Sequence, residues 1–176
     1  MRISHLRRNV ELKARDPDPA RSRTVCVGLG ADDRGLLNQR DTYFRAPNGR
    51  LKLREDGGLP AELIAYTRAD LPGERESAYR IVEIPQPEEL RHALAETLGI
   101  EIVVDKRRHL FVWENVRIHL DEVEGLGSFI ELEAVADPES DLTQEQQRVQ
   151  TLRDAFGIAE DDLVALSYSD LARPLS

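Results

Sequence analysis

The chain has 176 residues and a formal net charge of −9, and 40% of its residues are hydrophobic while 32% are charged. A single domain spanning residues 1–176 can bury about 70% of the surface that the unfolded chain exposes. No apolar run reaches the roughly 18 residues of a membrane-spanning helix, and the N-terminal residues lack the apolar segment of a secretory signal. The acidic balance argues against nonspecific binding to nucleic acid or to an anionic membrane.

Cys26 is the single cysteine, so the chain can form no internal disulfide and no thiol metal site. A reducing compartment suits such a chain, and we therefore expect a cytoplasmic protein. The predicted helix around Cys26 favours a place for it in the core. The sequence leaves the oligomeric state open, a homodimer included.

A strand over 8–16 comes first in chain order, and a helix that Asp18 caps and Pro19 opens follows it as far as Gly30. Further strands are predicted at 35–45, 50–55, 61–68, 76–84, 101–114, 116–123 and 128–135. Two longer helices are predicted at 88–99 and from Asp141 to Phe156. Turns such as APNG join most neighbouring strands as hairpins, which predicts an antiparallel α+β fold. An eight-stranded antiparallel sheet can close into a β-barrel, with the helices beside it.

The first strand carries its charged and polar side chains on one face. Asn9, Glu11, Lys13 and Arg15 alternate with apolar residues, about 7 Å from one charged side chain to the next. The same alternation recurs in several later strands. Positive and negative charges lie on different strands, since RLKLR is basic whereas ELE is acidic. One interpretation is that these faces point at water. The alternative, which the sign separation favours, is that helices cover the apolar faces and the charges line the inside of the barrel.

In that arrangement the inside of the barrel is rich in cations. The inward bases would be Lys13, Arg15, Arg50, Lys52, Arg54, Arg68, Lys106, Arg108 and Arg117, and the inward acids Glu11, Asp121, Glu131 and Glu133. Buried charge is costly unless it is paired or bound to an ion, so such a lumen calls for a polyanion. Phosphate chains suit the geometry of Arg and Lys. The carboxylates make sense beside phosphates as oxygen ligands of Mg²⁺ or Mn²⁺.

The ordered motifs resemble the CYTH family of triphosphate tunnel metalloenzymes, which includes class IV adenylyl cyclases, thiamine triphosphatases and inorganic triphosphatases. The matching stretches are NVELK, QRDTYF, LKLRE, YTR, DKRRHLF, LDEVEGLGSFIELE and SYSDL. They follow the family's order over nearly the whole chain. NVELK corresponds to the family signature E-x-E-x-K, with Asn9 in place of its first Glu.

The resemblance implies an eight-stranded antiparallel barrel around a tunnel. By the same resemblance, Mg²⁺ or Mn²⁺ would be bound by Glu11, Asp121, Glu131 and Glu133. The triphosphate would be bound by Lys13, Arg50, Lys52, Arg54, Arg68, Lys106, Arg108 and Arg117. Glu11 and Lys13 would be catalytic, with Lys13 as a proton donor to the leaving group.

The expected function is metal-dependent hydrolysis of inorganic tripolyphosphate, thiamine triphosphate or a nucleoside triphosphate. A class IV-type adenylyl cyclase is an alternative that would use the same site, with a ribose 3′-hydroxyl in place of water as the nucleophile. A non-catalytic nucleotide- or polyphosphate-binding module is a second alternative, and a purely structural barrel is a third.

Several polar residues have two interpretations. His119 shares a face with the charged residues of its strand and is either an acid–base group or a core histidine. Tyr66 and Tyr79 either contact a base or thiamine ring or pack against neighbouring side chains. Gln39, Asp41 and Tyr43 share one face of their strand because they are two residues apart, but this alternation leaves open which side of the sheet that face is on.

Overall fold

The computed structural model describes residues 7–58, 60–68 and 72–173. Its strands are β1 (Arg7–Arg15), β2 (Asp32–Phe44), β3 (Arg50–Asp56), β4 (Ala61–Arg68), β5 (Arg75–Ile84), β6 (Ile100–Trp113), β7 (Val116–Val123) and β8 (Gly127–Val135). Its α-helices are α1 (Pro19–Gly28), α2 (Pro87–Thr97), α3 (Thr143–Phe156) and α4 (Tyr168–Leu171). None of these helices is both long and apolar enough to cross a membrane, as far as the described residues show.

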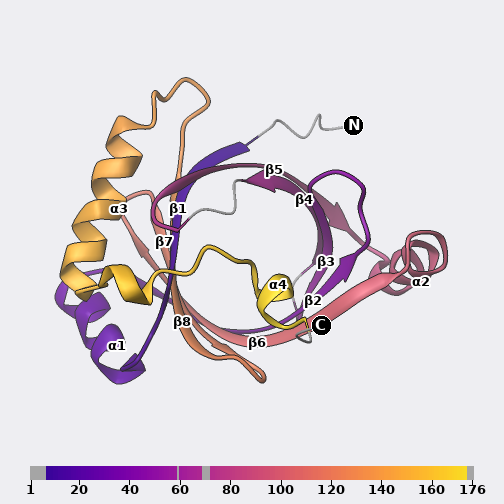
Figure 1. Cartoon of the computed structure of the whole chain (residues 1–176), viewed down its shortest axis with the longest axis horizontal. Helices are drawn as coiled ribbons and strands as arrows, with labels where there is room; N and C mark the ends of the chain where they lie inside the picture. Colours follow the sequence, from indigo (N-terminus) through magenta and orange to yellow (C-terminus); the bar gives the residue numbers. More distant parts are fainter. Residues whose placement is uncertain (1–6, 59, 69–71, 174–176) are drawn as a thin grey trace.

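The eight strands form a closed antiparallel barrel (Figure 1), in the order β1-β5-β4-β3-β2-β6-β7-β8. Strands β2 to β5 are neighbours in sequence order, and so are β6 to β8, as expected for hairpins. β1 completes the ring because it pairs with β5 on one side and with β8 on the other. The α+β class and the eight-stranded antiparallel barrel expected from the sequence are therefore confirmed.

The turn between β2 and β3 sets the register of that hairpin. Gly49 has a φ of +67°, and a Cβ built there would lie 2.8 Å from the backbone oxygen of Tyr66. Only glycine suits such a position, since it tolerates positive φ and has no Cβ to collide. The hairpin that leaves this turn pairs Tyr43 with Lys52 and Asp41 with Arg54.

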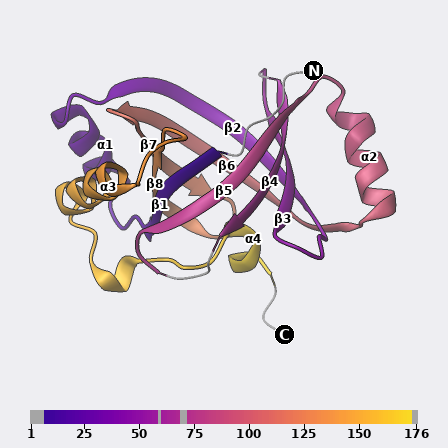
Figure 2. The same ribbon diagram turned by 90° about the horizontal axis from the view of Figure 1, so that it is seen from above.

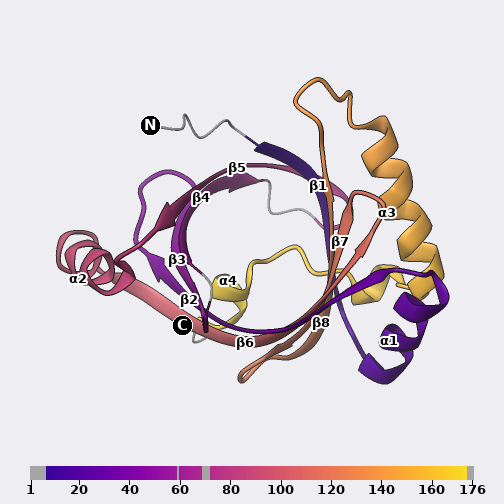
Figure 3. The ribbon, with the colours of Figure 1, turned by 180° about the vertical axis from the view of Figure 1, so that it is seen from behind.

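The helices cover the outside of the barrel. α1 and α3 lie together on the side formed by β1, β7 and β8, and α2 lies on the opposite side, against β2 and β3 (Figures 1, 2 and 3). The main hydrophobic core lies between the first pair of helices and the barrel, with Leu12, Ile118, Leu132, Val149 and Leu152 fully buried. The apolar faces of the strands thus point outward to the helices, which leaves the charged faces to the interior.

Two details of the helices differ from the sequence prediction. The helix predicted from Asp141 begins at Thr143, and Leu142 takes its N-cap position with a left-handed φ of +69°. Asp141 precedes the N-cap residue by one position, and its carboxylate accepts a hydrogen bond from the Thr143 backbone N–H at 3.0 Å. The segment after Gly157 also contains a 3₁₀ turn at Glu160–Asp162 and the short α4, so the described chain has four α-helices where three were expected.

We expect Leu132→Ala to lower the free energy of unfolding by about 2–5 kcal/mol, because its side chain is fully buried beneath α3 and truncation leaves a cavity. Urea denaturation followed by circular dichroism measures this change. Val103→Ala is the matched control, since Val103 is 42% exposed and buries little surface. Equal losses in the two variants would contradict this assignment of the core.

Candidate functional site

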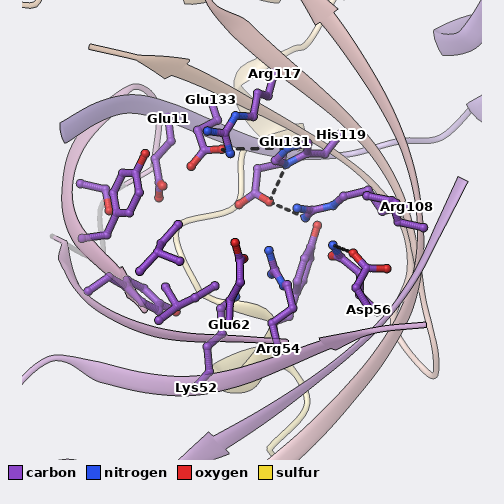
Figure 4. Close-up of a pocket in the computed structure, with 18 of the residues that line it drawn as sticks. Glu11, Lys52, Arg54, Asp56, Glu62, Arg108, Arg117, His119, Glu131 and Glu133 are labelled. Carbon is purple, nitrogen blue, oxygen red and sulfur yellow. Dashed lines mark hydrogen bonds and ion pairs between the residues drawn. The ribbon is translucent and has the colours of Figure 1, made fainter. Parts of the chain in front are cut away.

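The barrel encloses a cavity of about 430 Å³ whose wall is largely charged. Many of the residues expected from the sequence line it: Glu11, Lys13, Lys52, Arg54, Lys106, Arg108, Arg117, Glu131 and Glu133. Figure 4 shows that Glu11, Glu131 and Glu133 lie on one side of the cavity and that Lys52 and Arg54 lie on the other, together with Asp56 and Glu62. The cavity therefore has a basic wall on β3 and β6 and a carboxylate wall on β1 and β8.

Other predicted site residues lie elsewhere or cannot be placed. Arg50 is outside the cavity wall, and its guanidinium pairs with Asp170 of α4 at 2.9 Å. Arg15, at the end of β1, is exposed and lies over the Phe129 ring. Arg68 ends β4, and its side chain lies outside the described part of the structure.

Asp41 is the centre of the basic wall. Its carboxylate is fully buried and accepts hydrogen bonds from Lys52 and Lys106, each at 2.9 Å. Arg54 binds the same carboxylate through two nitrogens, both at 2.8 Å. Burial by itself would raise the pKa of Asp41, but the three cations outweigh burial and hold that pKa well below its usual range. Three strands, β2, β3 and β6, are thus joined at one carboxylate.

A second buried carboxylate, Asp121, holds Arg108. The two side chains form a bidentate pair with both contacts at 2.7 Å, and the Tyr168 hydroxyl donates to Asp121 at 2.8 Å. Arg108 also contacts Glu131 at 2.9 Å. Burial raises the pKa of Asp121, but Arg108 more than offsets this and leaves the pKa lowered. Asp121, which the resemblance places among the metal ligands, is thus engaged with Arg108 behind the cavity wall.

The glutamates of the carboxylate wall are held by basic or amide groups. Glu131 lies 3.6 Å from Lys13 and 3.4 Å from the Nδ1 atom of His119. Glu133 lies opposite Glu11 in the β1–β8 register and 3.6 Å from the guanidinium of Arg117. These side chains come together because alternate residues of neighbouring strands share one face of the sheet.

His119 is buried between two of these carboxylates. One ring nitrogen faces Glu131, and the other lies 4.0 Å from Glu133. Burial and the nearby Arg108 lower the pKa of His119, which favours the neutral imidazole. The His119 side chain lies on the cavity wall, among charged groups.

Comparison with known proteins identifies the family to which this arrangement belongs. The CYTH domain matches residues 7–168. The chain belongs to the CYTH family. A protein of Methanocaldococcus jannaschii that is named as a candidate adenylate cyclase is 27% identical over 145 residues, which are 77% of this CYTH chain and 77% of that protein.

Solved structures share the fold of this CYTH protein at low identity. A protein of Pyrococcus horikoshii superposes with a TM-score of 0.80 and 23% identity, over 94% of this chain and 99% of that one. A Hippeastrum protein, described as a candidate adenylyl cyclase with a dominant triphosphatase activity, has a TM-score of 0.58 and 16% identity, over 93% of each chain. The family resemblance expected from the motifs is thus confirmed.

The carboxylate wall of this CYTH protein provides oxygen donors of the type that Mg²⁺ and Mn²⁺ prefer. Within the described ranges, no three His, Cys, Asp or Glu side chains stand together as a metal-binding group. The Asn9 amide is 1% exposed and donates its N–H to Glu133. Its carbonyl oxygen accepts no hydrogen bond from the described residues. A buried acceptor without a donor, next to a carboxylate, fits a cation.

The C-terminal segment closes one end of the barrel. α4 lies across the barrel opening in Figure 1, and Tyr168 at its start is part of the cavity wall. The ammonium of Lys13 sits 3.9 Å from the centre of the Tyr168 ring. Arg75, which the sequence analysis did not include among the site residues, pairs with Glu11 at 3.0 Å and donates to the Ala165 carbonyl at 2.9 Å. The closing segment is therefore attached to the residues of the carboxylate wall.

We expect Asp41→Asn to lower the free energy of unfolding by roughly 3–5 kcal/mol, because it leaves three buried cations without their shared carboxylate. Added tripolyphosphate should raise the melting temperature of the variant more than that of the wild type, since an anion can replace the lost charge. Thermal denaturation with and without tripolyphosphate measures both effects.

The matched control for this prediction is Asp105→Asn. Asp105 pairs with Arg40 at 2.8 Å on the outer surface, so its loss should change the melting temperature far less. An Asp41→Asn protein that is as stable as Asp105→Asn, or that does not respond to tripolyphosphate, would show that Asp41 does not neutralise the basic wall.

Proposed function

We propose that this CYTH protein is a divalent-metal-dependent hydrolase of a triphosphate that binds inside the barrel. The observation that carries the proposal is the pairing of a basic wall with a carboxylate wall across one cavity (Figure 4). Asp56 and Glu62 also line this side of the cavity, where the basic wall gathers four cations around two buried aspartates. These residues are Lys52, Arg54, Lys106 and Arg108, with Asp41 and Asp121.

The basic wall would bind and orient the phosphates. Arg54 and Arg108 present planar guanidinium groups that can bind phosphate oxygens in pairs, while Lys52 and Lys106 act as point charges. Asp41 and Asp121 keep these four side chains in place before the substrate arrives, which reduces the reorganisation needed during the reaction. Arg50, Arg68 and Arg117 stay predicted phosphate ligands.

The carboxylate wall would hold Mg²⁺ or Mn²⁺, which when bound supplies Lewis-acid polarisation of a phosphoryl group. Glu131, Glu133 and Glu11 face the cavity and are the ligands that we propose. Asp121 stays a predicted ligand, although its contacts with Arg108 and Tyr168 favour the role of orienting Arg108. Lys13, which lies between Glu131 and the Tyr168 ring, would donate a proton to the leaving group.

An adenylyl cyclase of the class IV type is the second candidate. The Methanocaldococcus jannaschii relative is named for that activity, while the Hippeastrum protein is described by its triphosphatase activity. Hydrolysis needs only a water molecule near the phosphates, whereas cyclisation also needs the ribose 3′-hydroxyl held against the α-phosphate. Tyr66 and Tyr79 line the cavity, where they could contact an organic group of the substrate. We favour hydrolysis because it does not require the pocket to hold a ribose in a fixed orientation.

A module that binds the triphosphate without converting it is the third candidate. It differs from both enzymes because it would release no product. We propose a small-molecule triphosphate as the partner, without nucleic acid, and a cytoplasmic location, in keeping with the net charge of −9 and the single cysteine.

The deciding experiment incubates the protein with tripolyphosphate, thiamine triphosphate or ATP, each with Mg²⁺, Mn²⁺ or a chelator. Chromatography then separates phosphate, pyrophosphate and cyclic AMP. Metal-dependent release of phosphate supports the hydrolase. Cyclic AMP with pyrophosphate selects the cyclase, and saturable binding without any product selects the binding module.

We expect Arg54→Ala to weaken triphosphate binding by about 10- to 150-fold, the equivalent of roughly 1.5–3 kcal/mol for a charged hydrogen bond. Arg40→Ala is the matched control, since Arg40 precedes Asp41 on the same strand but points to the outer surface. Isothermal titration calorimetry with tripolyphosphate compares the two. Binding that is weakened more by Arg40→Ala than by Arg54→Ala would place the phosphates outside the barrel.

A further inference from the structure

We infer that the open end of the cavity binds a positively charged organic group, so that the substrate is a triphosphate ester that carries an ammonium-type cation. The inference rests on the proposed function, because it concerns the part of the same substrate that lies beyond the phosphates. The site consists of an acidic rim, formed by Asp56, Glu62 and Glu83, and of the amide oxygen of Gln39.

The acidic rim lies at the end of the barrel opposite the closing segment. Arg50 begins β3 and pairs with Asp170 of α4, whereas Asp56 ends the same strand. Glu62 lies near the start of β4 and Glu83 near the end of β5, so both are at the same end of the antiparallel sheet as Asp56. Asp56 and Glu62 are half-buried, and Glu83 is exposed. The rim therefore lies where the cavity meets solvent.

Two carboxylates of the rim face each other without a cation. Glu62 and Glu83 are directly opposite in the β4–β5 register, and like charges in such a pair destabilise a sheet. Arg54 lies next to Glu62 in Figure 4, but its guanidinium binds Asp41. Neither glutamate has an ion pair or a side-chain hydrogen bond with another described residue. Those residues also hold no metal-binding group, so the cation that would relieve the repulsion is an organic one.

The amide of Gln39 is the second, independent observation. Gln39 is 6% exposed and lines the cavity, and its amide nitrogen donates to the Asp56 carboxylate at 2.9 Å. An ionised carboxylate only accepts hydrogen bonds, so the amide oxygen is the atom turned away from Asp56. That oxygen is buried and accepts no hydrogen bond from the described residues. Buried acceptors without a donor are uncommon in folded proteins, and an N–H group of a ligand would satisfy this one.

The inner faces of β4 and β5 connect the rim with the phosphate-binding part of the cavity. Three successive inward pairs change from aromatic through aliphatic to acidic: Tyr66–Tyr79, Ile64–Ile81 and Glu62–Glu83. The apolar pairs suit an organic group, which inorganic tripolyphosphate lacks. The cavity volume of about 430 Å³ is also within the range of sites for organic ligands, roughly 300–1,000 Å³.

The polarity of the cavity decides the charge of that organic group. On β3 the inward side chains change from basic to acidic in one step, since Asp56 follows Arg54 by two residues, about 7 Å along a strand. A matching ligand carries phosphates at Arg54 and a positive charge one such step further out. The cations Arg7 and Arg117 lie on other strands, β1 and β7, and Arg117 is paired with Glu133. The rim itself thus stays acidic.

The test compares two synthetic esters that differ by one charge. Aminopentyl triphosphate has an ammonium group five carbons from the phosphates, and pentyl triphosphate lacks it. Isothermal titration calorimetry of the full-length protein, with a chelator present, measures both affinities without metal-dependent turnover. We expect the ammonium ester to bind about tenfold or more tightly, as for one charged hydrogen bond. Equal affinities, or tighter binding of the pentyl ester, would overturn the inference.

A double variant, Glu62→Gln with Glu83→Gln, tests the rim. It should lose the preference for the ammonium ester, while its affinity for pentyl triphosphate should not fall, because two negative charges near the phosphates are removed. Glu76→Gln is the matched control, since Glu76 lies on the outer face of β5 and pairs with Arg8 at 2.9 Å. It should keep the preference.

Two outcomes of the double variant would contradict the role of the rim. A preference that persists would place the cation elsewhere, and equal losses for both esters would show that the glutamates only support the barrel. If the double variant does not fold, the comparison of the two esters on the wild type still decides.

Two further ligands test the amide oxygen and the idea of a single substrate. The trimethylammonium form of the ester has the charge but no N–H group, so it should bind less tightly than the ammonium form. Equal binding of the two forms would remove Gln39 from the site. Free pentylamine should not raise the affinity for tripolyphosphate to that of the ammonium ester. If it does, the rim binds a separate amine, and the inference about the substrate is overturned.

The outcomes distinguish this inference from the proposed function. A protein that prefers aminopentyl triphosphate but releases no phosphate from any triphosphate with Mg²⁺ or Mn²⁺ would overturn the proposed hydrolase and leave the cation site supported. A protein that hydrolyses tripolyphosphate but binds the two esters equally would overturn the cation site alone.

Discussion

The interior of this barrel depends on one buried carboxylate. Asp41 binds Lys52, Arg54 and Lys106 at 2.8–2.9 Å, and it links three strands that would otherwise bring like charges together away from water. Such a cluster is tolerable only because every cation has a close anionic partner with good geometry. The shared carboxylate thereby holds the Lys52, Arg54 and Lys106 side chains at the cavity wall.

The hydrophobic core lies outside the barrel because the charged faces of the strands point inward. A strand that turns its charged face inward must bury its apolar face on the other side, and α1, α3 and α2 cover those faces from outside. In most small domains the helices and the sheet share one core that fills the interior. Here the packing that stabilises the fold is separated from the cavity, so the cavity wall is free to carry chemistry at little cost to the core.

The closing segment connects the two walls to the C-terminus. Tyr168 packs edge to face against Phe129, contacts the ammonium of Lys13 and donates a hydrogen bond to Asp121. Arg75 joins Glu11 to the backbone of the same segment. This short stretch therefore contacts groups on both sides of the cavity, and it contributes Ser167 and Tyr168 to the wall.

The sequence by itself determined which residues share a face, because side chains alternate along every strand and hairpin turns fix neighbouring strands. That reasoning found the barrel and put Glu11, Lys52 and Arg108 on its inner face. It left Asp41 undecided, although extending the predicted turn at 46–49 would have paired it with Arg54. Only the tertiary structure decided which inward groups meet, since β1, β6 and the segment after Leu163 approach one another through ring closure and not through local pairing. For this reason the partners of Asp121, the role of Arg75 and the orphan oxygen of Asn9 could not be read from the chain alone.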